Sequence, residues 1–165
     1  MRMLLPVFIL LLSLSGCATP GGRGLVAGQS TANDVEAAMG APAERITLAG
    51  GDAIWFYPRQ PSGRETYAVR LRPDGVVRSV QQVLTEENLK NIVAGTTTAK
   101  QVRELLGPPG TTSHNARMQR DVWEYTMFNA TQWDYFLYVQ MSAGDGIVRE
   151  VMMLKDYNKE SGHRD

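Results

Sequence analysis

Residues 25–42 read LVAGQSTANDVEAAMGAP, and residues 92–109 read IVAGTTTAKQVRELLGPP. The two stretches align without a gap, and eight of their eighteen positions are identical: Val26/Val93, Ala27/Ala94, Gly28/Gly95, Thr31/Thr98, Ala32/Ala99, Val35/Val102, Gly40/Gly107 and Pro42/Pro109. Further matches follow in the same order, namely W-x-Y at 55–57 and 123–125 and D-G at 74–75 and 145–146. Because chance similarity does not keep order across separate blocks, the sequence predicts two copies of one unit.

Each stretch carries the marks of one short helix. Thr31 with Asp34, and Thr98 with Gln101, have the spacing of an N-cap residue and the third helical residue, which can bond each other's backbone amides. Apolar residues then recur at helical spacing, as Val35, Ala38 and Met39 in the first copy and as Val102, Leu105 and Leu106 in the second. Gly40 and Gly107 are expected to end the helices in the left-handed conformation.

Sequence before and after these helices completes the unit. Thr85 followed by two glutamates predicts a leading helix in the second copy. Downstream, apolar and polar residues alternate in DVWEYTM (121–127) and WDYFLYVQM (133–141), and the D-G turns introduce third strands at 76–83 and 147–154. We therefore expect an α+β fold of two tandem helix-helix-β-β-β units, each an antiparallel meander with helices on one face. The units span 25–84 and 85–157, and a charged tail spans 158–165.

The first sixteen residues have the layout of an export signal, with Arg2, an apolar run and a small-residue cleavage site at Ser15-Gly16. A retained membrane anchor is the alternative, but a span needs about 20 apolar residues. Cys17 follows directly and is the one cysteine of the chain. An intramolecular disulfide is therefore excluded, and a free thiol would be a liability in an exported protein.

Leu14-Ser15-Gly16-Cys17 resembles a bacterial lipobox. The resemblance implies that residues 1–16 are a lipoprotein signal peptide and that Cys17 carries the lipid anchor, with acyl chains such as palmitate. Ala18, where an aspartate would favour the inner membrane, implies an outer-membrane protein facing the periplasm. Residues 17–24 would form the lipidated cysteine and a flexible, glycine-rich tether.

The order G-x-[ST]-T-x-x-x-V-x-x-x-[LM]-G-x-P, then W-x-Y and a D-G turn, resembles the SmpA/OmlA (BamE-like) family of outer-membrane lipoproteins. That resemblance implies a scaffold or accessory factor in envelope or outer-membrane protein assembly, with a protein partner such as the barrel-assembly machinery. The family pattern has one copy, whereas this chain has two. Tandem units are also similar to the β-lactamase inhibitory proteins, which implies an inhibitor or ligand-binding module as the alternative.

Composition and motifs give no support for catalysis. Basic and acidic residues number 17 each, so the chain lacks the charge excess of a nucleic-acid-binding protein. His114 and His163 stand apart from any nucleophile pattern, and no spacing resembles a metal site. We expect a protein that is not an enzyme, with no catalytic residues, no metal and no cofactor.

Binding to a protein partner is the function that remains, and the alternation of residues along the strands suggests which face of the sheet would bind it. If Trp55 and Tyr57, and their counterparts in the second copy, face the helices, then the opposite face exposes aromatic and arginine side chains, as protein interfaces favour. The candidate partner-binding residues are Phe56, Arg70, Arg72, Phe136 and Tyr138, with Glu124 on the same face. The alternative is that the repeats pack on each other or that flanking segments cover this face.

Overall fold

The computed structural model describes residues 21–157. The predicted signal peptide (1–16), Cys17, the first part of the tether and the charged tail (158–165) lie outside the described residues. The elements follow in the order α1 (Ala32–Met39), β1 (Glu44–Thr47), β2 (Ala53–Pro58), β3 (Thr66–Leu71), β4 (Val77–Gln82), α2 (Glu86–Leu89), α3 (Ala99–Leu106), β5 (Thr111–Asn115), β6 (Arg120–Phe128), β7 (Asp134–Ser142) and β8 (Val148–Lys155).

The chain is mostly β, so the predicted α+β class with two helix-helix-β-β-β units is wrong. Two four-stranded antiparallel sheets have the strand orders β1-β2-β3-β4 and β5-β6-β7-β8. Sequence patterns missed β1 and β5 because ERIT has one apolar residue and TTSHN, exposed throughout, has none, so neither shows an apolar alternation. The helices are also shorter than a helical layer requires, with eight residues in α1 and α3 and four in α2.

The two halves of the chain repeat the same hydrogen bonds between helix and sheet. Each helix N-terminus binds the D-G turn, and each sheet tyrosine holds the helix C-terminus: Ala32 N to Gly75 O (2.9 Å) and Ala99 N to Gly146 O (2.8 Å), then Tyr57 Oη to Gly40 O (3.2 Å) and Tyr125 Oη to Gly107 O (3.1 Å). The internal repeat of the sequence therefore has a counterpart in backbone geometry.

Both predicted capping boxes are confirmed. The Thr31 and Thr98 hydroxyls accept from the amides of Asp34 and Gln101, whose side chains accept from the cap amides in return. The helix ends differ from expectation in one respect. Gly40 has φ 81° and ψ −168°, a positive-φ extended conformation instead of the left-handed helical one, and Gly107 matches it closely. Side chains are essentially excluded from this region, so glycine permits the sharp exit into the next strand.

Each helix buries one stripe against one face of its own sheet. Val35 of α1 packs with Tyr57 and Val69, and Val102 of α3 packs with Tyr125 and Leu137. Tyr125, Leu137 and Val139 are fully buried against α3, so the condition that Tyr125 and Leu137 face the helix is met.

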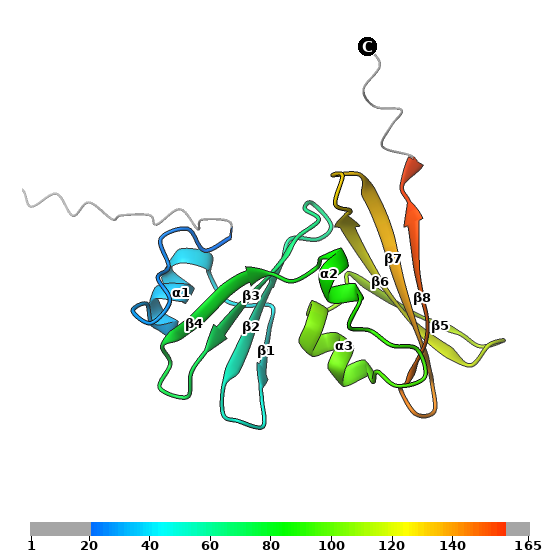
Figure 1. Ribbon diagram of the computed structural model, residues 1–165, viewed down its shortest axis with the longest axis horizontal. Helices are drawn as coiled ribbons and strands as arrows, with labels where there is room; N and C mark the ends of the chain where they lie inside the picture. The colour runs from blue at the N-terminus through cyan, green and yellow to red at the C-terminus, as the bar shows by residue number, and fades with distance from the viewer. Residues whose placement is uncertain (1–20, 158–165) are drawn as a thin grey trace, which may run out of the picture.

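A third core lies on the opposite face of the first sheet. Ile54, Phe56 and Ala68 form it, and the second half of the chain covers it. In Figure 1 the layers follow from left to right as α1, β1–β4, α2 with α3, and β5–β8. Arg103 of α3 donates from Nε to both carboxylate oxygens of Glu44 on β1, at 2.7 and 2.9 Å. The α3 helix therefore contacts both sheets.

Candidate functional site on the outer face of the second sheet

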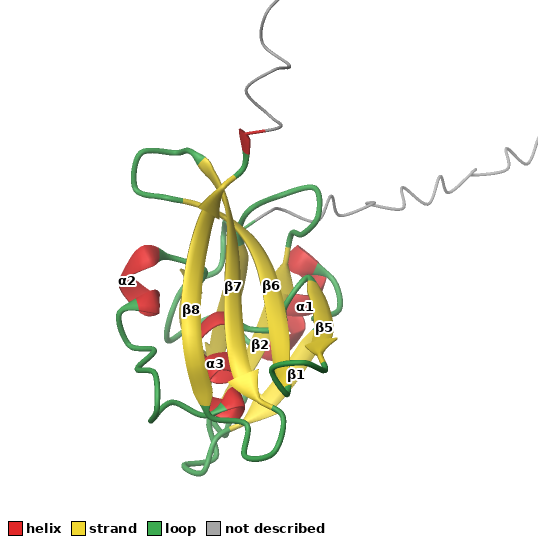
Figure 2. Ribbon diagram, turned by 90° about the vertical axis from the view of Figure 1, so that its right-hand side faces the viewer, coloured by secondary structure: helices red, strands yellow, loops and turns green. Residues whose placement is uncertain are grey.

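The second sheet presents one face to α3 and the other to solvent. Strand register puts Glu124 opposite Tyr138 and Tyr138 opposite Met152, and it puts Phe136 opposite Leu154, so these side chains share the face that points away from α3. No helix of the described residues lies over this face, which is turned toward the viewer in Figure 2. We call it the outer face and define it by Val122, Glu124, Thr126, Phe136, Tyr138, Gln140, Glu150, Met152 and Leu154.

Apolar and aromatic side chains lie beside polar ones on the outer face. Phe136 and Tyr138 are half-buried, and their ring centroids lie 6.4 Å apart in a tilted arrangement. Leu154 next to them is 53% exposed, and Met152 is half-buried. Aromatic and methionine side chains with polar neighbours are enriched at protein interfaces.

Polar groups on the same face are already organised. Arg120 donates to Gln140 at 3.0 Å and to Glu150 at 2.9 Å, so a cation, an amide and a carboxylate form one group beside the aromatic pair. Their mutual bonds hold the side chains in place before any partner arrives, which reduces the entropy lost on binding.

The structure contradicts the sequence interpretation for Phe56. That side chain is fully buried, because the C-terminus of α3 approaches it at Gly107. The alternative, that the two repeats pack on each other, is correct for the first sheet. Phe136 and Tyr138, in contrast, stay accessible on the outer face.

The two arginine candidates lie elsewhere. Arg70 is exposed and belongs to β3, opposite Ile54 on the first sheet. Arg72 follows β3 and pairs with Asp74 at 3.1 Å, next to the D-G turn. The structure therefore does not bring these two residues to the outer face.

A loop from the first half of the chain closes the upper end of the outer face, and sequence reasoning missed it. Gln60 Oε1 accepts from the Thr126 amide at 2.9 Å and from its hydroxyl at 3.2 Å. Arg64, 7% exposed, donates from Nε to Asp134 at the start of β7. These contacts join positions about seventy residues apart, and no local pattern in the sequence announces them.

Glu124 affects the ionisation of its neighbour. The pKa of the Tyr138 hydroxyl is raised, first by burial and then by the negative charge and hydrogen bond of Glu124. Both causes penalise the tyrosinate, because burial removes water and a carboxylate repels a second anion. Glu124 and Tyr138 therefore act as a coupled pair on the outer face.

Replacing Glu124 with glutamine should lower the pKa of Tyr138. The neutral amide removes the repulsion of the tyrosinate, while burial keeps the pKa above the ordinary tyrosine value. A pH titration of the tyrosine ring carbons by NMR measures the change. Tyr57, whose pKa is raised to about 12 mainly by burial, serves as the control and should not move. An unchanged Tyr138 pKa in the variant would contradict the contact.

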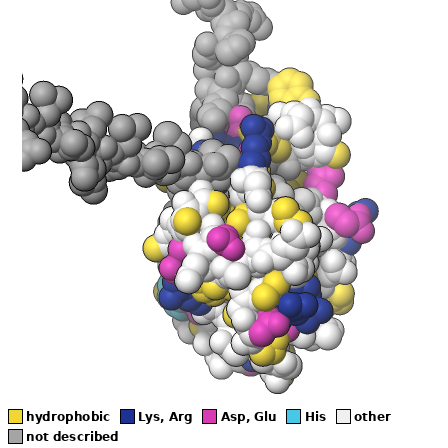
Figure 3. Space-filling model, turned by 90° about the vertical axis from the view of Figure 1, so that its left-hand side faces the viewer, with side chains coloured by type: hydrophobic (Ala, Val, Ile, Leu, Met, Phe, Trp, Pro, Cys, Tyr) yellow, Lys and Arg dark blue, Asp and Glu magenta, His cyan; other side chains and the backbone are white. Residues whose placement is uncertain are grey.

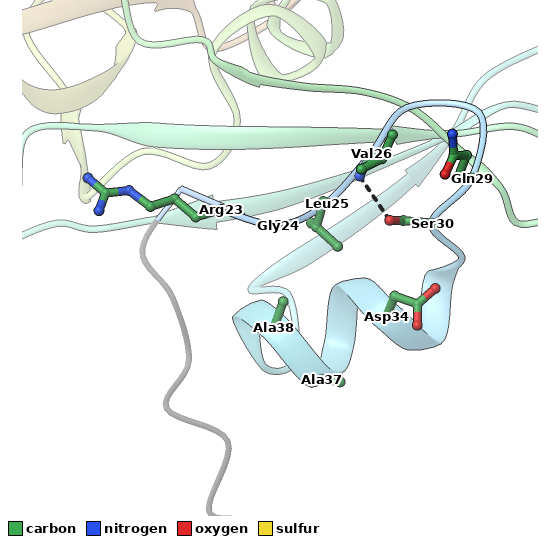
Figure 4. A pocket seen from close by; sticks show the side chains of 9 residues that line it. All are labelled: Arg23, Gly24, Leu25, Val26, Gln29, Ser30, Asp34, Ala37 and Ala38. Atoms are coloured by element: carbon green, nitrogen blue, oxygen red, sulfur yellow. Dashed lines mark hydrogen bonds between the residues drawn. The ribbon is translucent and has the colours of Figure 1, made fainter.

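A hollow of about 520 Å³ lies beside α1, away from the outer face, and its side chains give little basis for assigning a function. The loop before the helix and the helix itself line it, and Figure 4 shows the short side chains of Ala37 and Ala38 at its wall. Asp34 points to it, yet that carboxylate is already used in the N-cap with Thr31. On this side of the molecule, hydrophobic and charged side chains are interspersed (Figure 3), and we assign no function to it.

His114 on β5 and Asp121 on β6 lie directly opposite each other in the second sheet. His114 Nδ1 lies 2.8 Å from Asp121 Oδ1, with both side chains about half exposed. Residues 21–157 contain no cluster of three or more His, Cys, Asp or Glu side chains that could hold a metal ion. None of the helices in the same range is long and apolar enough to cross a membrane.

Comparisons with known proteins do not name a family. No family model and no curated protein matches the chain. Among solved structures, the chain is similar to the crystal structure of a DUF4309 family protein (YjgB) from Bacillus subtilis, with 20% identity over 81% of this chain and 84% of that one. The TM-score is 0.31, and we base no argument on this likeness.

Proposed function

We propose that this protein is a lipid-anchored, non-catalytic interaction protein that binds a protein partner on the outer face of its second sheet. Its anchor would be the lipid on Cys17, and its place the periplasmic side of the outer membrane. A scaffold or accessory factor in envelope or outer-membrane protein assembly fits that location. The observation that carries the proposal is the accessible group of Phe136, Tyr138, Met152 and Leu154.

Comparison with the first sheet shows why the exposure of Phe136, Tyr138, Met152 and Leu154 matters. On its corresponding face Ile54 and Phe56 are buried, and the C-terminus of α3 contacts Phe56 at Gly107. Exposed apolar groups rimmed by polar side chains mark interaction sites in soluble proteins. A partner would bury Phe136 and Tyr138 on the second sheet, as α3 buries Phe56 on the first.

Crosslinked capture from intact cells tests the proposal. We expect the lipidated protein to recover outer-membrane or barrel-assembly partners, and the double change Phe136→Ser with Tyr138→Ser to reduce recovery at least tenfold. Two exposed apolar residues away from the outer face, Val93 and Met118, provide the matched control when both are changed to serine. Circular dichroism of each variant confirms that the fold persists.

The anchor is tested in the same experiment. A Cys17→Ser form should lose capture of membrane-bound partners, because it lacks the lipid. Recovery of one soluble periplasmic enzyme by both the lipidated and the Cys17→Ser forms would favour the inhibitor alternative. Unchanged recovery by the Phe136/Tyr138 variant would contradict the proposed use of the outer face.

A further inference from the structure

A hollow of about 440 Å³ lies at the upper end of the outer face, between the two halves of the chain. Pro61 and Arg64 line it from the β2–β3 loop, and Thr111, Glu124, Thr126 and Phe136 line it from the second sheet. We call it the Glu124 hollow. Because it combines a carboxylate, hydroxyls and an aromatic ring, it can accept a side chain that is both charged and flat.

The charges of the Glu124 hollow leave one negative charge unpaired. Arg64 is neutralised by Asp134, and its Nη1 donates to the carbonyls of Pro61 and Gly63. Glu150, farther along the outer face, pairs with Arg120. Among residues 21–157, no lysine or arginine forms an ion pair with Glu124, whose bonded neighbour is the neutral hydroxyl of Tyr138. The hollow is therefore complementary to a cationic group, whereas the Glu124 carboxylate would repel an anionic ligand.

The position of Phe136 in the Glu124 hollow favours an arginine over a lysine side chain as the bound cation. Its ring lines the hollow that contains Glu124, and an arginine guanidinium can stack on an aromatic face while it pairs bidentately with a carboxylate. A lysine ammonium is a compact point charge and lacks the fork that matches two carboxylate oxygens. Arginine thus fits the hollow better than lysine.

The chain already uses this arrangement once. Glu44, on the covered face of the first sheet, receives both of its bonds from the Nε of Arg103, and the Arg103 guanidinium lies 5.5 Å from the Trp123 ring centroid. Glu44 lies opposite Phe56 across the strands, so it occupies the face that corresponds to the outer face. In this contact the carboxylate comes from β1 of the first sheet and the ring from β6 of the second sheet. It is therefore an internal precedent for an arginine held between a carboxylate and an aromatic ring.

We propose that the Glu124 hollow binds an arginine side chain of the protein partner, held between the carboxylate of Glu124 and the ring of Phe136. This inference rests on the proposed function and adds the chemistry of the partner: a protein segment that presents arginine to the outer face. Salt weakens such a contact because the charges are only half-buried.

The probe is Nα-acetyl-L-arginine amide, titrated into the ¹⁵N-labelled mature chain carrying Cys17→Ser and followed by NMR. We expect shifts at the amides around Thr111, Glu124 and Thr126 and a dissociation constant in the millimolar range. The neutral isostere Nα-acetyl-L-citrulline amide should bind at least tenfold more weakly. Glu124→Gln should weaken arginine binding at least tenfold. Glu87→Gln, which removes a paired carboxylate on α2, away from the outer face, should leave it within twofold.

Equal binding of the two probes, or unchanged arginine binding by Glu124→Gln, would overturn the inference. Capture separates this failure from failure of the proposed function. If the Phe136/Tyr138 variant loses its partner while Glu124→Gln keeps it, the arginine inference fails and the proposed function stands. If the probe binds selectively while the Phe136/Tyr138 variant captures partners normally, the arginine site stands and the proposed use of the outer face fails.

Discussion

Replacing Phe56 with alanine should lower the free energy of unfolding by about 3–5 kcal/mol, the usual cost of removing a fully buried phenylalanine. The ring fills the third core between the first sheet and the end of α3, and structures relax only partially around such a cavity. Urea unfolding of the original protein and of the Phe56→Ala variant measures the loss. Because total stabilities are about 5–15 kcal/mol, this change removes a large share.

Phe136 is the matched control, since it is the same residue type on the corresponding face of the second sheet. It is half-buried and has no helix of the described residues above it, so Phe136→Ala should cost about 1 kcal/mol or less. Equal losses for Phe56→Ala and Phe136→Ala would contradict the packing of α3 on the first sheet.

Replacing Gly107 with alanine should destabilise the protein more than replacing Gly40. Both glycines have positive φ near 80° and extended ψ, so each change incurs a backbone cost of about 1–3 kcal/mol. At Gly107 the new methyl carbon would also lie 2.7 Å from Phe56 Cδ1 and 3.0 Å from Thr66 Cγ2, whereas nothing lies within 4 Å of it at Gly40. Crowding a packed site adds about 1–3 kcal/mol at Gly107 alone.

A double variant isolates the contact. With Phe56 already changed to alanine, Gly107→Ala should cost less than it does alone, because the ring is gone and only the contact with Thr66 remains. Residues in contact give such non-additive losses, whereas distant residues give additive ones. Additive unfolding energies for Phe56→Ala and Gly107→Ala would mean that the ring and the glycine do not touch.

Sequence patterns predicted correctly those features that depend on residues close together in the chain. A threonine and a residue three positions later are enough to make a capping box, so Thr31 and Thr98 could be identified without tertiary information. Alternation likewise grouped Tyr125 and Leu137 on one face of the sheet, and the structure buries that face. Strands β1 and β5 escaped prediction because ERIT has one apolar residue and TTSHN has none, so neither shows an apolar alternation. The fold class was wrong because two four-stranded sheets with only short helices make the chain mostly β.

The candidate site was predictable only in part. Phe136 and Tyr138 follow from strand parity, but Gln60 and Arg64 reach the outer face through a loop that belongs to the other half of the chain. Met152 and Leu154 join the site through the register of β8 on β7. Loop docking and register are set by the whole fold, and therefore no short stretch of residues contains them.

Sequence by itself determined where the two principal helices begin and end, because caps and glycines act within a few residues. It also determined which residues share a strand face with Tyr125, because alternation has a period of two residues. Only the tertiary structure decided which outward face is covered. Phe56 and Phe136 have the same parity, yet α3 lies against the first and no described helix lies against the second. Coverage depends on how the two halves pack, a contact between residues far apart in the chain, and alternation along one strand cannot encode it.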